Sequence, residues 1–425
     1  MKKAAMRWKR AGLILLASGM LLGGCSRAKE PVVASAPPLP TAITAPAQTL
    51  PTVQEEEMVD LSSLNDFALR LFQAGSSDAS WVVSPVNVAL ALGQLRPGAG
   101  EQTAAQMDSV LGLEGELTQD QVWASLASLR TQLESLAPES LWQGWSLMMG
   151  EGPSVQVQYT NLLSQSLGTQ VNLVDYEAAQ YREEYSAWVK QASGGLITTM
   201  TGIPETNEPL VVTAAAALDG KWAKAFNEQN IRNATFELEG GQKVSTAMMT
   251  TKATPPLLES EQATFLAMPL DGNLEAWMIL PPEGTALKDF VASMTMEQLT
   301  AWRSQATATS CLVSVPKIDI SSSEDITETL RAMGLTAPFD EAQADFSAMG
   351  NKLSVSRLLS AFRIRLGETG VEVADEPMSQ RMLRGMDREM KGYTFDRPFV
   401  MIIAEKDTGN LVMLAAVARP SEDRG

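Results

Sequence analysis

The residue types that most often carry out catalysis are missing from this chain of 425 residues or stand in the wrong setting. It contains no histidine, which excludes a Ser-His-Asp or Cys-His relay and a histidine-ligated zinc site. Its two cysteines, Cys25 and Cys311, are too few for a cysteine-ligated metal. Ser314 and Lys317 have Ser-x-x-Lys spacing, but that chemistry needs the serine at a helix start, and residues 313–320 alternate as a strand. We therefore expect no catalytic site, no metal and no cofactor.

The most informative segment is instead a long polar stretch, residues 368–382. It follows a strand-like run ending at Leu366 and precedes the apolar block 398–404. Methionines and arginines are frequent in and just after it, and it shows neither a helical nor a strand period. A loop of this length within a compact chain is usually functional rather than a simple connection.

Composition sets the class of protein. The chain is 45% hydrophobic and 20% charged, which is typical of a globular protein with a large core. Its length allows two or three domains or one large mixed domain. The net charge of −17 argues against a nucleic-acid partner, because such a partner requires a basic surface.

The N-terminus reads as a targeting segment, residues 1–24. A basic stretch precedes the short apolar run 11–20, which is too short to span a bilayer. The sequence Leu-Leu-Gly-Gly-Cys then ends at Cys25, and it resembles a bacterial lipoprotein processing site. The alternative is an ordinary secretory signal with an incidental cysteine. The lipoprotein interpretation implies lipidation at Cys25, membrane attachment through two or three acyl chains, and a domain that is extracellular or periplasmic.

Residues 25–57 are rich in Pro, Ala and Thr and predict an extended tether between the anchor and the domain at 58–425. With Cys25 lipidated, Cys311 has no disulfide partner, and we expect it to be a small buried hydrophobe in a strand.

The periodic segments of the domain change character along the chain. Helices are expected first, with apolar residues at helical spacing, and strands dominate after residue 210. The expected helices include 85–93, 101–111, 119–136, 159–167, 178–190 and 324–333. The expected strands include 210–218, 264–269, 274–281, 352–366 and a hairpin of 398–404 with 411–418. This order favours an α+β fold.

Several blocks, taken in order, resemble the serpin family. The opening of the polar segment, residues 368–372 (Glu-Thr-Gly-Val-Glu), resembles the family's loop hinge, Glu-Glu-Gly-Thr-Glu. Residues 80–113, 187–199 and 213–226 are similar to further family blocks, and so are 268–281, 314–320, 344–347, 396–399 and 411–420. Together these blocks span residues 60–420 in the family order.

This resemblance implies a serpin fold with three β-sheets, about nine helices and an exposed reactive-centre loop at about 368–395. It also implies inhibition of a serine protease rather than enzymatic activity. The protease would cut the loop, the loop would insert into the main sheet as a new strand, and the acylated protease would be distorted.

Family spacing from Gly370 places the reactive bond at Arg384–Gly385. An arginine suits a trypsin-like protease, whose specificity pocket ends in a carboxylate; a subtilisin-like or a cysteine protease is the alternative partner. The family also assigns positions to a hinge, a shutter region beneath the main sheet and a breach region under the loop, and we expect a monomer. The hinge residues are Glu368, Gly370, Val371, Glu372, Val373, Ala374, Asp375 and Pro377, the shutter residues Ser84, Asn87 and Ser360, and the breach residues Gly220, Lys221 and Trp222.

The hinge departs from the family pattern in ways that keep a second function open. On insertion, Val371, Val373, Asp375 and Pro377 would face inward. The valines suit a buried strand, but an unpaired buried Asp375 is unfavourable, and Pro377 cannot donate to a sheet ladder. Asp375, Glu376 and Pro377 favour the alternative of a non-inhibitory cell-surface serpin. Such a protein would be cleaved by a protease as a substrate or would bind another protein. In the shutter region, Ser360 stands where the family usually has a histidine.

Overall fold

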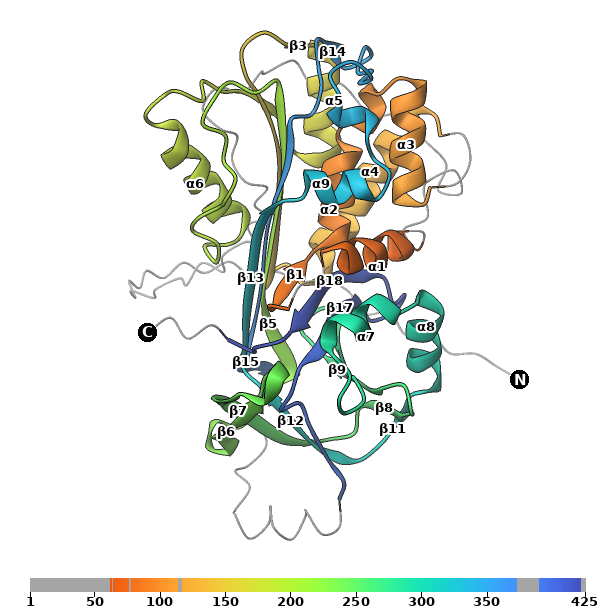
Figure 1. The fold of residues 1–425 in the computed structure, drawn as a ribbon, viewed down its shortest axis with the longest axis vertical. Coiled ribbons are helices and arrows are strands. Elements are labelled where there is room, and N and C mark those ends of the chain that lie inside the picture. Colours follow the sequence, from red (N-terminus) through yellow and green to blue (C-terminus); the bar gives the residue numbers. More distant parts are fainter. Residues whose placement is uncertain (1–61, 63, 76–77, 114–116, 373–389, 422–425) are drawn as a thin grey trace, which may run out of the picture. The chain divides into compact units, whose positions relative to one another are not determined.

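The computed structural model describes residues 62, 64–75, 78–113, 117–372 and 390–421. Over these residues helices dominate the first part and strands the second (Figure 1). No described helix is both long enough and apolar enough to cross a membrane. The α-helices are α1 (Leu64–Ala74), α2 (Pro85–Gly93), α3 (Glu101–Leu111), α4 (Gln119–Leu136), α5 (Val157–Leu167), α6 (Tyr181–Ala192), α7 (Leu287–Ser293), α8 (Met296–Gln305) and α9 (Thr327–Ala332).

A five-stranded sheet contains the longest strands described and positions the candidate site. Its order is β13 (Ile318–Asp325), β15 (Arg357–Glu372), β5 (Leu210–Lys224), β2 (Leu141–Met149) and β4 (Val171–Leu173). β5 and β15 are direct neighbours and run parallel, whereas β13 and β2 run antiparallel to them on either side.

Two further sheets of four or more strands occur in the described part of the chain, and a two-stranded pairing joins β3 (Ser154–Val155) to β14 (Gly350–Asn351). The seven-stranded sheet has the order β1 (Trp81–Val83), β18 (Leu411–Val417), β17 (Phe399–Glu405), β10 (Leu274–Leu280), β9 (Thr264–Pro269), β8 (Pro256–Glu259) and β11 (Thr307–Ala308). The four-stranded sheet has the order β16 (Gly392–Thr394), β12 (Cys311–Pro316), β7 (Lys243–Ala253) and β6 (Ile231–Glu237).

The five-stranded sheet is buried on both faces over much of its length. In Figure 1 it is seen edge-on, with α6 on one side and α1, α2, α4 and α5 on the other. The α6 side has its own apolar cluster, which includes Tyr185 and Trp188, while the opposite side belongs to the main core. β5 meets both layers through four consecutive, fully buried alanines, residues 214–217. Their small side chains allow the helices to approach the sheet closely on both faces.

The expected elements are largely present, with two corrections. The alternating run 313–320 is not one strand: β12 ends at Pro316 in the four-stranded sheet and β13 begins at Ile318 in the five-stranded sheet. The helix expected at 324–333 begins only at Thr327, because β13 continues to Asp325. In addition, β5 extends beyond the predicted strand to Lys224, and β15 runs from Arg357 to Glu372 where a strand over 352–366 was expected.

Candidate functional site

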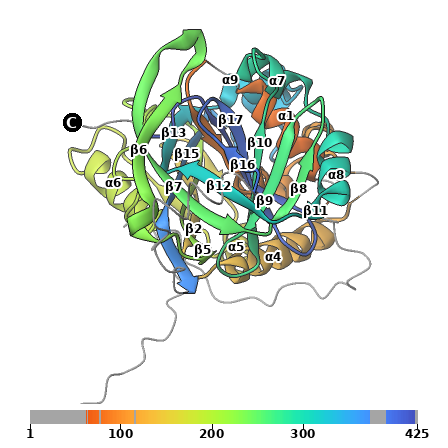
Figure 2. The same cartoon turned by 90° about the horizontal axis from the view of Figure 1, so that it is seen from below.

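The structure describes only the beginning of the predicted hinge. Glu368, Gly370, Val371 and Glu372 form the end of β15. The described chain resumes at residue 390 and enters β16, which pairs with β12 in the four-stranded sheet (Figure 2). The intervening residues therefore join a strand of one sheet to a strand of another. The other predicted positions lie outside the described residues, namely Val373, Ala374, Asp375, Pro377, Arg384, Gly385 and Cys25.

The contact between β5 and β15, which we call the seam, is a continuous parallel ladder. It runs from the pair Arg357 and Val211 to the pair Leu366 and Gly220. The hinge begins at the end of β15, so the loop starts beside one end of the seam. At that end Gly220 makes room for its register partner, since an added methyl group would lie 2.4 Å from Leu366 Cδ2.

A bulge in β15 separates the seam from the hinge. Between the pair Leu366–Gly220 and the pair Gly370–Trp222, β15 contains two more residues than β5. An irregularity of this kind is typical of sites where a strand must redirect its side chains. Trp222 crosses the bulge, because its Nε1 donates to Gly367 O at 2.7 Å while its side chain is 2% exposed. Trp222 also meets Phe226 edge-to-face, with ring centroids 5.4 Å apart.

An ion pair connects Glu368, the first hinge residue, to Lys317, which directly precedes β13. Lys317, between β12 and β13, lies with its Nζ 2.5 Å from Glu368 Oε2. The hydrogen bond from Lys317 lowers the pKa of Glu368 below its ordinary value. The backbone of Glu368 is held as well, since its carbonyl accepts from Phe226 N at 2.9 Å.

Gly370 is required by a close approach of two backbones. A methyl group at this position would lie 2.2 Å from Ala225 N and 2.5 Å from Ala225 Cα. Backbone atoms cannot move aside as a flexible side chain can, so any larger residue must push the hinge away from β5. Beyond it, Ala225 N donates to Glu372 O at 3.1 Å, while the apolar side chain of Val371 is 65% exposed.

The remaining breach residue, Lys221, belongs to a polar contact with the chain beside the sheet. Its Nζ lies 3.5 Å from Glu139 Oε2. Its backbone carbonyl accepts from Asp271 N at 2.8 Å. The structure thus brings Gly220, Lys221 and Trp222 together at the loop-proximal end of β5.

The shutter residues are buried, and Ser84 and Asn87 bond to each other whereas Ser360 bonds within the sheet. Ser84 begins α2 without capping it through its side chain, and its Oγ donates to Val412 O at 2.8 Å. Asn87 Nδ2 donates to Ser84 Oγ at 2.8 Å. Ser360 Oγ donates to Glu324 O at 3.3 Å, within the sheet. Asn87 Oδ1 is buried without a partner among the described residues, so its contacts under the sheet are incompletely satisfied.

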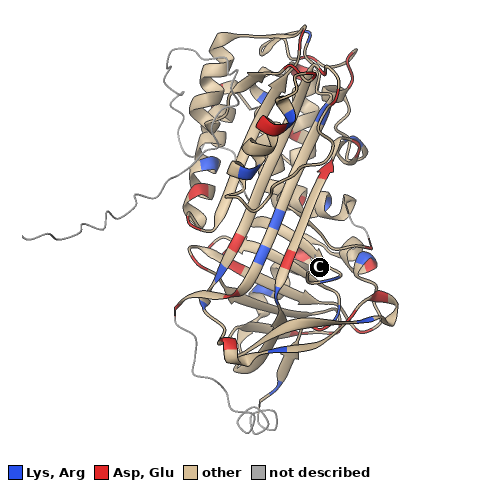
Figure 3. Ribbon diagram, turned by 90° about the vertical axis from the view of Figure 1, so that its left-hand side faces the viewer, with Lys and Arg blue, Asp and Glu red and all other residues tan. Residues whose placement is uncertain are grey.

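Two bidentate ion pairs lie on the face of the sheet that packs against α6, near the loop-proximal end of the seam. Figure 3 shows basic and acidic positions close together on neighbouring strands of this sheet. Arg365 on β15 binds Asp219 on β5, with nitrogen–oxygen distances of 2.8 and 2.5 Å. Arg363 on β15 binds Asp319 on β13, with both distances 2.7 Å, and also donates to Leu196 O at 2.6 Å. The hydrogen bonds to the two carboxylates raise the pKa of both arginines.

The C-terminal side of the loop is anchored by a second set of contacts. Lys391 Nζ lies 2.5 and 2.6 Å from the carboxylate oxygens of Glu259 on β8, and 5.3 Å from the ring centroid of Tyr393. Its carbonyl accepts from Leu312 N on β12 at 3.1 Å. The hydrogen bond from Lys391 lowers the pKa of Glu259.

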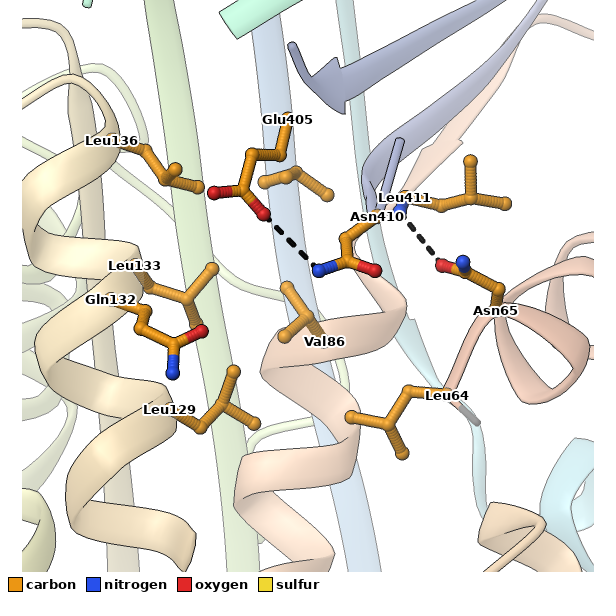
Figure 4. Close-up of a pocket in the computed structure, with 11 residues that line it drawn as sticks. Leu64, Asn65, Val86, Leu129, Gln132, Leu133, Leu136, Glu405, Asn410 and Leu411 are labelled. Atoms are coloured by element: carbon orange, nitrogen blue, oxygen red, sulfur yellow. Dashed lines mark hydrogen bonds between the residues drawn. The ribbon is translucent and has the colours of Figure 1, made fainter. Parts of the chain in front are cut away.

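A small apolar pocket lies between α2, α4 and the turn from β17 to β18 (Figure 4). Leu129 and Leu133 line one side, and Asn410 and Glu405 the other, joined by a hydrogen bond of 3.1 Å. Its space of about 30 Å³ admits water-sized groups only. It gives no basis for a ligand site.

The ion pairs at the two ends of the loop and across the seam were not predicted from the sequence. Lys317 was read only as part of a rejected catalytic motif, and its partner Glu368 is distant in sequence. Glu259 and Lys391 carried no local signal. Asp219 did carry one, because it is a charge directly after the apolar run 210–218 in a buried strand.

We predict that Gly370→Ala weakens the pairing of the hinge with β5 by about 1–3 kcal/mol, as expected when a side chain is forced against fixed atoms. Hydrogen exchange at the amides of Ala225 and Phe226 should accelerate, because their acceptors lie on the displaced hinge. Gly367→Ala is the matched control, since no atom lies within 4 Å of a methyl group there. Equal exchange in the two variants would contradict the close-approach argument.

We predict a pH-dependent contribution from Glu368. Because its pKa in the folded protein is depressed, the pair with Lys317 stabilises the fold above the ordinary carboxyl pKa of about 4.3, and this stabilisation disappears as the pH falls through the lower folded-state pKa. The urea midpoint of Glu368→Gln should therefore lie furthest below that of the unmodified protein near neutral pH. The difference should shrink in acid and be absent in a Lys317→Met background. A difference in urea midpoint that does not change with pH would contradict this prediction.

A family model described as Serpin (serine protease inhibitor) matches residues 62–420. Serpin B5 from Xenopus tropicalis is 24% identical over 372 residues, which cover 84% of this chain and 96% of that protein. Leukocyte elastase inhibitor from Equus caballus is 25% identical over 383 residues, covering 85% of this chain and all of that protein (100%).

A solved structure shows the same fold. The thermophilic serpin tengpin, in its native state, matches with a TM-score of 0.77 at 20% identity, covering 89% of this chain and 97% of that chain. The family match spans nearly the whole described part of the molecule, including all three large sheets. The chain belongs to the serpin family of serine protease inhibitors.

Proposed function

We propose that this protein inhibits a trypsin-like serine protease by presenting the bond Arg384–Gly385 as bait and then inserting the cut loop into the seam. The observation that carries the proposal is the parallel pairing of β5 and β15 with the loop beginning at the end of β15. A chain that turns back from β15 runs antiparallel to both strands. Its insertion replaces one parallel ladder by two antiparallel ladders, which are at least as stable per residue.

The length of the seam fits the position of the reactive bond. The unbroken ladder extends from Arg357 to Leu366 on β15. At about 3.3 Å per residue it is roughly 33 Å long. A segment of equal length that begins at residue 373 ends at residue 382, two residues before Arg384. Complete insertion would therefore carry an acylated Arg384 to the far end of the sheet.

An exposed apolar hinge residue supports a metastable native state. Val371 is 65% exposed, and full burial of a valine side chain contributes about 1.5 kcal/mol or more. Each inward residue of the inserting strand that is buried in the same way adds to the driving force. Asp375 and Pro377 oppose it, because one carries a charge and the other lacks a ladder donor. Inhibition thus requires that the remaining contacts outweigh these two residues.

Arg384 is the proposed specificity residue, for which the chain supplies its own controls. The relative named leukocyte elastase inhibitor supports protease inhibition in general, and the arginine supports a protease with an acidic specificity pocket. Mixed with trypsin, the protein should give a covalent band at the summed mass on a denaturing gel, with a new N-terminus at Gly385. Arg384→Ala should reduce the rate of complex formation about a hundredfold or more.

The variants Arg381→Ala and Arg388→Ala, which remove neighbouring arginines, should retain the complex. Loss of the complex in either of them, with retention in Arg384→Ala, would move the reactive bond. Cleavage at Arg384 without any covalent complex would instead show that the hinge does not insert, as expected for a non-inhibitory cell-surface serpin.

We also propose that the protein is exported and held at the bacterial cell surface by lipid on Cys25, with residues 25–57 as the tether. The support is the targeting pattern of residues 1–25 and the composition of the tether. A monomeric inhibitor placed there would protect the surface against proteases from outside the cell.

Cys25→Ser should release the protein from the membrane fraction and abolish labelling by radioactive palmitate. Cys311→Ser is the control, because Cys311 is buried in β12, and it should leave both unchanged. Membrane retention of Cys25→Ser would refute the lipid anchor.

A further inference from the structure

We propose that the ion pair of Arg365 with Asp219 is a latch on the seam, which sets how readily β5 and β15 separate and so regulates strand insertion. The pair lies in register across the seam, because Arg365 and Asp219 are direct ladder partners. This inference deepens the proposed function, on which its biological meaning rests, while its physical content concerns only the opening of the sheet.

Insertion cannot leave the latch in its present geometry. Neighbouring strands lie about 4.8 Å apart, and a strand placed between them doubles that spacing. The guanidinium of Arg365 now holds both oxygens of Asp219 at 2.8 and 2.5 Å. Bidentate pairing of this kind depends on fixed geometry, so the contact is lost as the strands part.

The position of the latch makes it act early. Insertion begins at the hinge and reaches the unbroken part of the ladder at its last pair, Leu366–Gly220. Arg365 is the next residue of β15, so its ion pair is the first one that an entering strand meets within the unbroken ladder. At the opposite end, Arg357 of β15 pairs at 2.8 Å with Glu208, which precedes β5, and an entering strand reaches this contact last.

The second bidentate pair provides an internal comparison. Arg363 and Asp319 have the same chemistry, lie on the same face and are held at 2.7 Å. This pair joins β15 to β13, which form a ladder of their own, and separation of β15 from β5 does not require that ladder to break. Its rupture is therefore not part of seam opening. The two pairs are close enough to influence each other, since Asp319 and Asp219 both act on both arginines.

The test measures seam opening by hydrogen exchange in the native, uncut protein, comparing Asp219→Asn with Asp319→Asn. Exposed ion pairs have modest energies, so Asp219→Asn should speed exchange of the amides that bond across the seam by about two- to fivefold. Raising the NaCl concentration should speed exchange of the same amides in the unmodified protein, because salt screens the ion pair. The effect of salt should be much smaller in Asp219→Asn, which lacks the pair. Asp319→Asn should change the exchange of the seam amides much less than Asp219→Asn does, because Asp319 acts on Arg365 only indirectly.

A charge swap keeps the test independent of misfolding. Asp219→Arg combined with Arg365→Asp should restore slow exchange, whereas Asp219→Arg alone should not. Equal effects of Asp219→Asn and Asp319→Asn, or none from either, would overturn the latch.

Covalent complex formation with trypsin, followed in the same variants, tests the proposed function separately. Seam amides that respond as expected without any complex would support the latch and refute inhibition. A covalent complex that forms while exchange of the seam amides is unchanged by Asp219→Asn would support inhibition and refute the latch.

Discussion

Direct hydrogen bonding between β5 and β15 is the constraint on which the other features depend. Two parallel neighbours have room between them for an antiparallel strand only if their own ladder breaks. The apolar cluster beside α6 and the main core pack against opposite faces of β5, where residues 214–217 are all alanine. The loop begins where the ladder ends. The same backbone pairing therefore keeps the native sheet closed and defines the place where it can open.

Contacts at the end of the seam hold the hinge without covering it. Glu368 is fixed by Lys317, and Gly370 touches the backbone of Ala225, but Val371 remains in solvent. Trp222 joins the two strands across the bulge. This combination of a fixed base and an uncovered apolar side chain is consistent with a segment that is held ready for burial rather than already buried.

The strong periodic segments could be predicted from sequence, and long-range charge pairing could not. The helix at 119–136 and the strand at 264–269 were predicted with their observed bounds, since their patterns are local. The break at Pro316 was missed because alternation continues across it into a strand of another sheet. The ion pairs of Lys317 and Lys391 join residues far apart in the chain, which a single sequence does not reveal. The expectation of a non-enzyme, drawn from the missing histidine, agrees with membership of an inhibitor family.

The place of β17 and β18 in the seven-stranded sheet has a consequence for the cleaved protein. A cut after Arg384 would divide the chain into a large piece and residues 385–425, which include both of these strands. β17 pairs with β10, β18 pairs with β1, and both strands are buried over nearly their whole length. The shorter piece would then remain bound in that sheet between β1 and β10, and the product would be one stable two-chain molecule rather than two separated pieces.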